Sequence, residues 1–412
     1  MGKVDSQFPV DSLTGLRASR FGIYLHFPYC LSKCPYCDFA SVVAKDIPET
    51  RYLQAVEAEL RLRLPELARR QPIEVDSIFL GGGTPSLWHP RHVDKLLQTL
   101  VKSFSVRSDA EVTLEANPGA SDADRFAEYR RLGINRLSIG VQSLTPATLR
   151  ALGRDHTPDD AENAFRAART AKFDNVSMDF IYGVHTQTIE QVKFDALRAT
   201  GWAPEHLSAY ALTLEKESLA EEVPLAKKLE RGEIVLPSET EIIEMGDALE
   251  EIYAAAGFVR YEISNYARDK RHSVHNLLYW TGGEYLALGA GATGCLDQAN
   301  EYRPEKMSAV RYSNFRSVER YFSAVEARLL PESSRELLSS LELFAERLSM
   351  GLRLTEGIRL TETCRIFGQD SEARIVQLNK FIQQGYARRE GEKVSLTHRG
   401  LNLHSAVCAA LV

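Results

Sequence analysis

The feature that most constrains the fold of this chain is an alternation of short apolar segments with longer helical patterns. Six strand-like segments recur between residues 22 and 212, and helical patterns with apolar residues three or four positions apart lie between them. The strand-like segments are residues 22–27, 75–80, 111–116, 136–141, 176–181 and 207–212. Such a repeat predicts parallel strands that are joined by crossover helices.

The number of repeats favours an α/β fold of the barrel type. A complete (β/α)8 barrel takes eight units over about 250 residues, whereas six units here occupy about 210 residues. The pattern therefore fits an incomplete (β/α)6 barrel, and an open doubly wound sheet fits it as well. In both folds, ligands bind at the carboxyl ends of the strands.

The repeat stops after about residue 230, and the composition changes. Residues 258–295 are rich in aromatic side chains, 337–350 and 373–383 have helical patterns, and 385–396 resemble two short strands around a Glu-Gly turn. Helices followed by a hairpin predict a small winged-helix-like domain. We expect an N-terminal tail (1–20), a barrel (21–230), a connecting region (231–330) and a C-terminal domain (331–412).

Composition narrows the classes of function. Among 412 residues, 50 Lys and Arg against 56 Asp and Glu give a net charge of −6, which argues against a chain that binds nucleic acid over its whole surface. No run of 18 apolar residues occurs, so no transmembrane segment is expected. The first 20 residues lack the apolar stretch of a signal peptide, and we expect a cytoplasmic protein.

Three of the six cysteines lie within eight residues, as Cys30, Cys34 and Cys37. Close cysteines in a reducing compartment bind metal more often than they pair. The C-x3-C-x2-C spacing suits three corners of an iron–sulfur cube and leaves the fourth iron open. A structural zinc site and three ordinary buried thiols are the alternatives, although zinc usually takes four ligands in two pairs. The scattered Cys295, Cys364 and Cys408 are expected to be ordinary thiols.

The same loop, placed after the first strand, resembles the signature of the radical S-adenosylmethionine (SAM) superfamily. Further motifs, in order, resemble the oxygen-independent coproporphyrinogen oxidase group, which contains oxidases and related heme chaperones. The similarity covers roughly residues 20 to 300, and the C-terminal domain extends it. The motifs begin at Tyr24 (YLHFPYC), Gly81 (GGGTP), Glu115 (EANP), Leu137 (LSIGVQ), Leu152 (LGR), Asp179 (DFIYG) and Glu262 (EISN).

The resemblance implies a [4Fe–4S] cluster on Cys30, Cys34 and Cys37, with SAM on its open iron. A glycine-rich turn at a strand end lets backbone N–H groups approach a ligand closely. A buried aspartate at position 179 is costly without a partner, and an arginine at 154 suits a carboxylate. The residues implied in SAM binding are Tyr24, Tyr36, Gly82, Gly83, Thr84, Glu115, Gln142, Arg154, Asp179 and Ala211.

A second motif, HNLLYW, combines a possible axial iron ligand with large aromatic side chains. The residues alone favour a packed aromatic segment. The heme chaperones of the group carry the same pattern, and the resemblance therefore implies heme binding by His275, Asn276, Tyr279 and Trp280.

Two features separate the members of the group. The oxidases have the pattern C-x3-C-x2-C-x-C and a longer N-terminal extension, whereas Phe39 stands here at the place of the fourth cysteine and only 29 residues precede Cys30. His185 and Thr293 depart from the group pattern, and Thr293 replaces a histidine near the proposed heme region. The main hypothesis is a heme chaperone that binds heme as cargo and delivers it to an acceptor such as a membrane-bound hemoprotein.

Two other functions remain open. An oxygen-independent coproporphyrinogen III oxidase would use SAM in radical chemistry to decarboxylate its substrate to protoporphyrinogen IX. A zinc-stabilised nucleic-acid adaptor would use the basic residues Arg388, Arg389 and Lys393, although charges on a hairpin are more often simply solvated. No nucleic-acid partner is expected.

Overall fold

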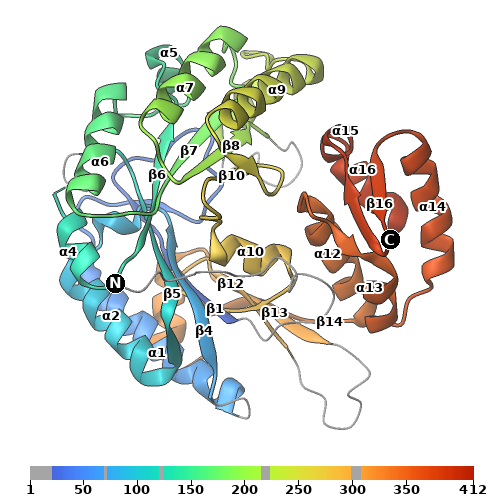
Figure 1. Ribbon diagram of the computed structural model, residues 1–412. Helices are drawn as coiled ribbons and strands as arrows, with labels where there is room; N and C mark the ends of the chain where they lie inside the picture. Colours follow the sequence, from blue (N-terminus) through green and yellow to red (C-terminus); the bar gives the residue numbers. More distant parts are fainter. Residues whose placement is uncertain (1–20, 69–71, 120–123, 215–222, 298–307) are drawn as a thin grey trace, which may run out of the picture.

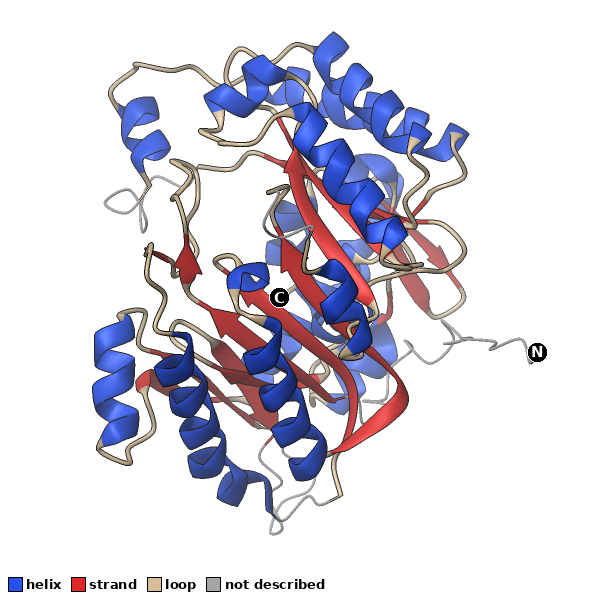
Figure 2. Ribbon diagram, turned by 90° about the vertical axis from the view of Figure 1, so that its left-hand side faces the viewer, coloured by secondary structure: helices blue, strands red, loops and turns tan. Residues whose placement is uncertain are grey.

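The computed structural model describes residues 21–68, 72–119, 124–214, 223–297 and 308–412. The expected N-terminal tail lies outside the described residues. One sheet of 12 strands runs through the larger part of the molecule, in the order β14-β13-β12-β11-β1-β4-β5-β6-β7-β8-β10-β9. Figures 1 and 2 show it as a curved layer with helices on its outer side.

The six predicted strands form the parallel centre of this sheet, which confirms the α/β fold class. They pair as parallel neighbours in chain order. Their bounds are β1 (Phe21–Phe27), β4 (Glu74–Gly82), β5 (Ser105–Ala116), β6 (Arg136–Gln142), β7 (Val176–Tyr182) and β8 (His206–Ala211).

Both edges of the sheet carry strands that the sequence pattern did not predict. After β1, the sheet continues through the parallel β11 (Glu284–Leu288) and the antiparallel β12 (Thr293–Asp297), β13 (Ala309–Asn314) and β14 (Glu332–Leu338). At the other edge, β8 is followed by β10 (Asn265–Ala267) and β9 (Val259–Arg260). The aromatic-rich segment is therefore part of the same sheet.

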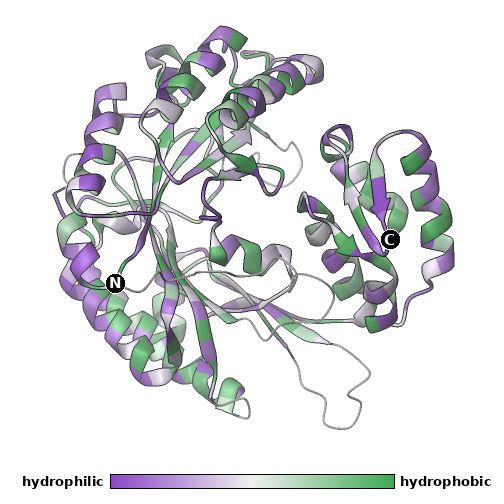
Figure 3. Cartoon of the chain, in the orientation of Figure 1, coloured by the Kyte–Doolittle hydropathy of each residue, from purple (hydrophilic) through white to green (hydrophobic). Residues whose placement is uncertain are grey.

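The outer helices cover the apolar side of the sheet. Their polar faces point outward in Figure 3, and on β6 the fully buried Leu137, Ile139 and Val141 belong to the core beneath them. The helices are α1 (Glu49–Leu67), α2 (Pro90–Ser103), α4 (Phe126–Arg131), α5 (Pro146–Ala151), α6 (Pro158–Thr170), α7 (Ile189–Gly201), α9 (Glu239–Ala255) and α11 (Val318–Glu326). The short α8 (Pro224–Glu230) lies against the cysteine loop instead, where the Leu225 N–H donates to the Pro35 carbonyl. The alternate residues of β6, Ser138, Gly140 and Gln142, line a cavity instead.

The C-terminal residues form a smaller unit with its own apolar core, which lies beside the barrel in Figure 1. Its sheet has the order β15-β17-β16. The elements are α12 (Ser340–Arg353), β15 (Ile358–Arg359), α13 (Leu360–Ile366), α14 (Ser371–Gln383), β16 (Ala387–Glu390), β17 (Lys393–Leu396), α15 (His398–Leu401) and α16 (His404–Leu411). The predicted hairpin is present as β16 and β17, and the domain boundaries at 20, 230 and 330 stay a prediction.

The helix predicted over 337–350 begins later than expected. Leu337 and Leu338 belong to β14, where they pair with β13. Ser339 then caps α12, because its side chain accepts from the backbone N–H of Glu342 while the Glu342 carboxylate accepts from the backbone N–H of Ser339. This reciprocal cap fixes the helix start more strongly than the leucine spacing does.

Candidate functional site

A cavity of about 290 Å³ lies at the carboxyl ends of the central strands. It brings together most of the residues that the sequence pointed to, from loops and strands far apart in the chain. The predicted residues that line it are Cys30, Cys34, Tyr36, Cys37, Gly82, Gly83, Thr84, Glu115, Gln142, Arg154 and Asp179. Tyr24 and Ala211 lie outside this lining, although Tyr210, beside Ala211, is part of it.

The three clustered cysteines are partly exposed at one wall of the cavity. Cys30 ends β2 (Tyr29–Cys30), and its sulfur lies 3.5 Å from the Thr84 hydroxyl. Cys34 and Cys37 share a tight turn, in which the Cys37 N–H donates to the Cys34 carbonyl over 3.1 Å. Burial, together with the neighbouring thiolates, raises the pKa of Cys30 and of Cys37.

The donor set fits a cluster better than a single ion. No three His, Cys, Asp or Glu side chains in the described part of the chain converge on a point where one metal ion would bind. In an iron–sulfur cube, each thiolate binds a different iron, so the sulfurs surround the cluster and do not meet at one atom. The lining of one cavity contains all three thiols.

The glycine turn after β4 holds the cysteine loop against the sheet. A Cβ on Gly83 would lie 2.7 Å from the Tyr29 carbonyl oxygen and 3.0 Å from the Cys30 sulfur. The N–H groups of Gly82, Gly83 and Thr84 donate to Glu115, to Phe27 and to Tyr29, respectively. These N–H groups are therefore already hydrogen-bonded within the protein. The glycines matter here because they allow the cysteine loop to approach the turn closely.

Glu115 lies at the carboxyl end of β5, beneath the glycine turn. Its carboxylate accepts from the Gly82 N–H over 3.0 Å. Burial raises the pKa of Glu115 to about 8, with a further contribution from the Asp179 carboxylate. Two acidic side chains thus face one cavity, and a cationic group of a ligand would stabilise the charged form of both.

Asp179 is half-buried and has several hydrogen-bond partners. Its carboxylate accepts from three serine hydroxyls, those of Ser138 over 2.8 Å, Ser177 over 3.1 Å and Ser208 over 2.6 Å. Ser208 is its direct neighbour on β8. The carboxylate is thereby held in one orientation at the cavity wall.

Arg154 connects the cysteine loop to the strand ends. Its guanidinium donates to the Cys34 sulfur over 3.4 Å, to the Asn117 side-chain oxygen over 2.8 Å and to the Gly140 carbonyl over 3.1 Å. Gln142, the last residue of β6, has a left-handed backbone conformation (φ 62°) at a point where the pairing of β6 with β7 is irregular. This conformation is uncommon outside glycine and occurs often at functional sites.

The HNLLYW motif lies on α10 (Val274–Trp280), against the inner side of β1 and β4. His275 is buried, and both ring nitrogens have partners, with Ser77 Oγ and the Tyr279 hydroxyl each at 2.8 Å. Burial lowers the pKa of His275 to about 3. Tyr279 and Trp280 line a second cavity, and the lining of that cavity contains neither His275 nor Asn276.

Tyr24 stands between the two cavities. Its ring stacks on Phe79 with a centroid distance of 6.1 Å and on His275 with 6.3 Å. Its hydroxyl lies 3.1 Å from His26, whose other ring nitrogen lies 2.8 Å from the Ala40 carbonyl oxygen. His26 therefore ties β1 to the end of the cysteine loop.

Two positions that depart from the group pattern lie outside the linings of both cavities. Thr293 is on β12, and its hydroxyl is 2.8 Å from that of Ser313 on β13. The lining of neither the first nor the second cavity contains Thr293. His185 follows β7 in a loop, where desolvation lowers its pKa.

The sequence analysis missed several residues of the first cavity. Asn117 links Arg154 and the Thr84 hydroxyl, and Ser138 pairs directly with Glu115 in the sheet. Polar residues inside otherwise apolar parallel strands were the available signal, since such strands are usually apolar throughout. Phe39, the residue that distinguishes the heme chaperones from the oxidases in the sequence pattern, also lines this cavity, and 57% of its surface is exposed.

Comparison with known proteins identifies the class to which this fold and site belong. Residues 24–197 match the family model "Radical SAM superfamily", and residues 338–403 match "HemN C-terminal domain". The crystallised coproporphyrinogen III oxidase HemN of Escherichia coli has the same fold, with a TM-score of 0.78 at 19% identity over 98% of this chain and 92% of that one. The fold and the match to the family model define a radical SAM protein of the HemN-like group.

Curated relatives narrow the family further. The heme chaperone HemW of Mycobacterium tuberculosis is 31% identical over 98% of this chain and 99% of its own length. HemW of Escherichia coli is 38% identical over 66% of this chain and 69% of its own length. The chain belongs to the HemW family. Among the described residues, no helix is both long and apolar enough to cross a lipid bilayer.

Proposed function

We propose that this protein is a cytoplasmic heme chaperone that carries a [4Fe–4S] cluster and SAM, binds heme as cargo and delivers it to an acceptor hemoprotein. The observation that carries this proposal is the similarity to a heme chaperone over 98% of the chain. The proposed acceptor is a hemoprotein without its heme, for example one bound to a membrane.

In this proposal, Cys30, Cys34 and Cys37 bind three irons of the cluster. When bound, the cluster would supply an open iron, which the amino and carboxylate groups of SAM would chelate. The Thr84 hydroxyl and the Arg154 guanidinium, 3.5 and 3.4 Å from the nearest sulfurs, stabilise negative charge on the thiolates.

The wall opposite the cysteines is proposed to hold the rest of SAM. Glu115 and Asp179 offer carboxylates, while Gln142 offers an amide that both donates and accepts hydrogen bonds. Tyr36 packs at the cysteine side. Tyr24 and Ala211, which are outside the lining, are proposed to support SAM binding only through neighbouring residues.

The cluster and its SAM are tested by anaerobic reconstitution with iron and sulfide. The expected result is visible absorption of a [4Fe–4S] cluster that changes when SAM is added, and its loss in Cys34→Ala. The matched control is Cys408→Ala, since Cys408 lies in the C-terminal core. A colourless, zinc-loaded protein would refute the cluster.

The chaperone function is tested by titration with heme under the same conditions. Saturable binding supports the proposal, and no saturation rejects it. The oxidase alternative is tested in parallel with coproporphyrinogen III, SAM and a reductant. Because Phe39 stands at the position where the oxidase pattern has a fourth cysteine, we expect no repeated turnover of coproporphyrinogen III. Multiple turnovers to protoporphyrinogen IX would favour the oxidase.

A further inference from the structure

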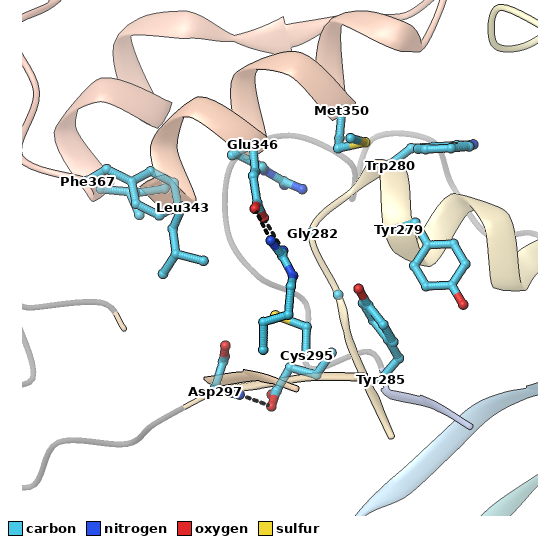
Figure 4. Close-up of a pocket in the computed structure, with 15 residues that line it drawn as sticks. Tyr279, Trp280, Gly282, Tyr285, Cys295, Asp297, Leu343, Glu346, Met350 and Phe367 are labelled. Atoms are coloured by element: carbon cyan, nitrogen blue, oxygen red, sulfur yellow. Dashed lines mark hydrogen bonds and ion pairs between the residues drawn. The ribbon is translucent and has the colours of Figure 1, made fainter. Parts of the chain in front are cut away.

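A second cavity, of about 540 Å³, separates the barrel from the C-terminal unit. This volume is within the usual range of about 300–1,000 Å³ for small-molecule sites. Its lining comes from both units, through α10, β11 and β12 on one side and α12 and α13 on the other (Figure 4).

The floor of this cavity is a row of three side chains on adjacent strands. Tyr285 on β11 pairs directly with Cys295 on β12, and Cys295 pairs with Arg311 on β13. Directly paired residues of antiparallel strands point to the same face of a sheet. The thiol of Cys295 therefore lies between a phenol and a guanidinium, and all three line the cavity.

The walls suit a large flat apolar ligand. Tyr279 meets Tyr285 edge to face, with ring centroids 4.7 Å apart and planes at 89°. Trp280 stands beside them, and Leu343, Met350 and Phe367 face them from the C-terminal unit (Figure 4). A macrocycle with one face over the floor would have its apolar edges against these two walls.

An ion pair crosses the same cavity, from β13 in the floor to α12 of the C-terminal unit. The Arg311 guanidinium pairs with both oxygens of the Glu346 carboxylate, at 2.6 and 2.7 Å. Arg347 also lines the cavity, and a Cβ on Gly282 would lie 2.9 Å from one of its terminal nitrogens. A ligand carboxylate would pair with Arg347, or with Arg311 in place of the Glu346 carboxylate, and would have to avoid Glu284 and Asp297, which also line the cavity.

His275, the residue of the HNLLYW motif with the chemistry of an axial ligand, is poorly placed to bind iron here. Its two ring nitrogens already have partners in Ser77 and Tyr279, and its ring stacks on Phe79 with a centroid distance of 5.0 Å. To bind iron, His275 would have to break a buried hydrogen bond, which is costly. Its geometry suits a positioning residue that orients Tyr279.

Resting on the proposed function, we propose that the heme cargo binds in this second cavity and that Cys295 is its axial iron ligand. Thiolate is one of the ligands by which proteins hold heme iron. As the Fe–S bond forms, the thiol releases its proton to solvent, and the iron keeps its oxidation state. The nearby Arg311 guanidinium favours the thiolate by its charge. The C-terminal unit thus supplies one half of the binding site.

The test is the electron paramagnetic resonance and absorption spectrum of the protein loaded with ferric heme. The expected wild-type spectrum is that of thiolate-ligated heme. Cys295→Ser is expected to lose this signature and to bind heme at least about tenfold more weakly, whereas Cys408→Ala, the matched thiol control, keeps both. His275→Ala is expected to keep thiolate ligation while its heme affinity falls.

Three results would overturn the assignment. They are a histidine-ligated wild-type spectrum that is lost in His275→Ala, an unchanged spectrum in Cys295→Ser, and unchanged heme affinity in Met350→Trp, which fills the cavity from the other unit. Circular dichroism shows that each variant is folded. Failure of the proposed function is distinguishable, because the wild-type protein would then bind no heme at all.

Discussion

At the scale of single residues, Gly83 is packed closely against backbone atoms in the first cavity. Its position next to the Tyr29 carbonyl and the Cys30 sulfur leaves no room for a methyl group. Backbone hydrogen bonds hold the segment that contains Cys30 against the glycine turn. The Gly83 N–H donates to the Phe27 carbonyl, and the Thr84 N–H donates to the Tyr29 carbonyl. The position of this thiol thus depends on a residue without a side chain.

Gly83→Ala is therefore expected to reduce cluster assembly severely while leaving the protein folded. The added Cβ would push against backbone atoms, which cannot move as a flexible side chain can. Iron and sulfide content after anaerobic reconstitution measures the effect. Gly201→Ala is the matched control, because nothing lies within 4 Å of a Cβ at that position. Equal iron content in both variants would contradict the expectation.

Glu115 predicts a specific pH dependence of stability in the protein without SAM. The folded state raises the pKa of Glu115 from 4.5 to about 8, so between these values it holds a proton that the unfolded chain has released. The free energy of unfolding must then fall as pH rises through this window. Glu115→Gln removes this contribution and should gain stability relative to wild type between pH 5 and pH 8.

Urea denaturation at these two pH values measures the difference, and glutamine keeps an acceptor for the Gly82 N–H. The prediction is contradicted when the difference in unfolding free energy between the two proteins is the same at both pH values.

At the scale of elements, α10 is a short helix held by one buried carboxylate. Glu111 on β5 accepts from the N–H groups of Val274 and His275, each over 3.0 Å. Arg136 lies 3.8 Å away and balances its charge. Because a helix of this length is not stable alone, its place between the two cavities depends on these contacts and on packing.

Glu111→Ala should therefore loosen α10 and lower the free energy of unfolding by about 3 kcal/mol, since it leaves a buried arginine without its partner. Hydrogen exchange followed by mass spectrometry should show faster exchange over residues 274–280. Glu111→Gln, which keeps an acceptor, should have a smaller effect. Unchanged exchange in Glu111→Ala would show that packing alone holds this helix.

Which elements the sequence predicts depends on how regular their patterns are. The six central strands have short apolar runs followed by helices, and all were predicted within a few residues except the early part of β5. The edge strands β9 to β14 lack this alternation of apolar runs and helices, because their pairing is determined by tertiary neighbours. For the site, motif resemblance found Glu115 and Arg154, but Asn117 and Ser138 depend on contacts between distant segments.

At the scale of the whole molecule, a buried ion pair joins the C-terminal unit to the barrel. The Arg353 guanidinium on α12 donates over 2.9 Å to Glu262, whose side chain is fully buried. The same guanidinium lies over the Trp280 ring, 4.4 Å from its centre. Trp280 and α12 both line the second cavity, so this contact also fixes its two walls relative to each other.

Arg353→Met is expected to lower the free energy of unfolding by about 3 kcal/mol, because a buried carboxylate loses its charged partner. The control is Arg359→Met, which breaks a surface pair 3.8 Å long and should cost less than about 1 kcal/mol. Chemical denaturation of both variants measures the difference. Similar values for the two would mean that the Glu262 pair does not hold the units together.

The central claim is that the tetrapyrrole is cargo and leaves the protein unchanged. The most direct measurement is mass spectrometry of the tetrapyrrole recovered from the protein after incubation with heme, SAM and reductant, with the cluster intact. We predict unmodified heme, in an amount that saturates at about one per chain. A chemically altered tetrapyrrole, formed in amounts that grow with time, would contradict the claim.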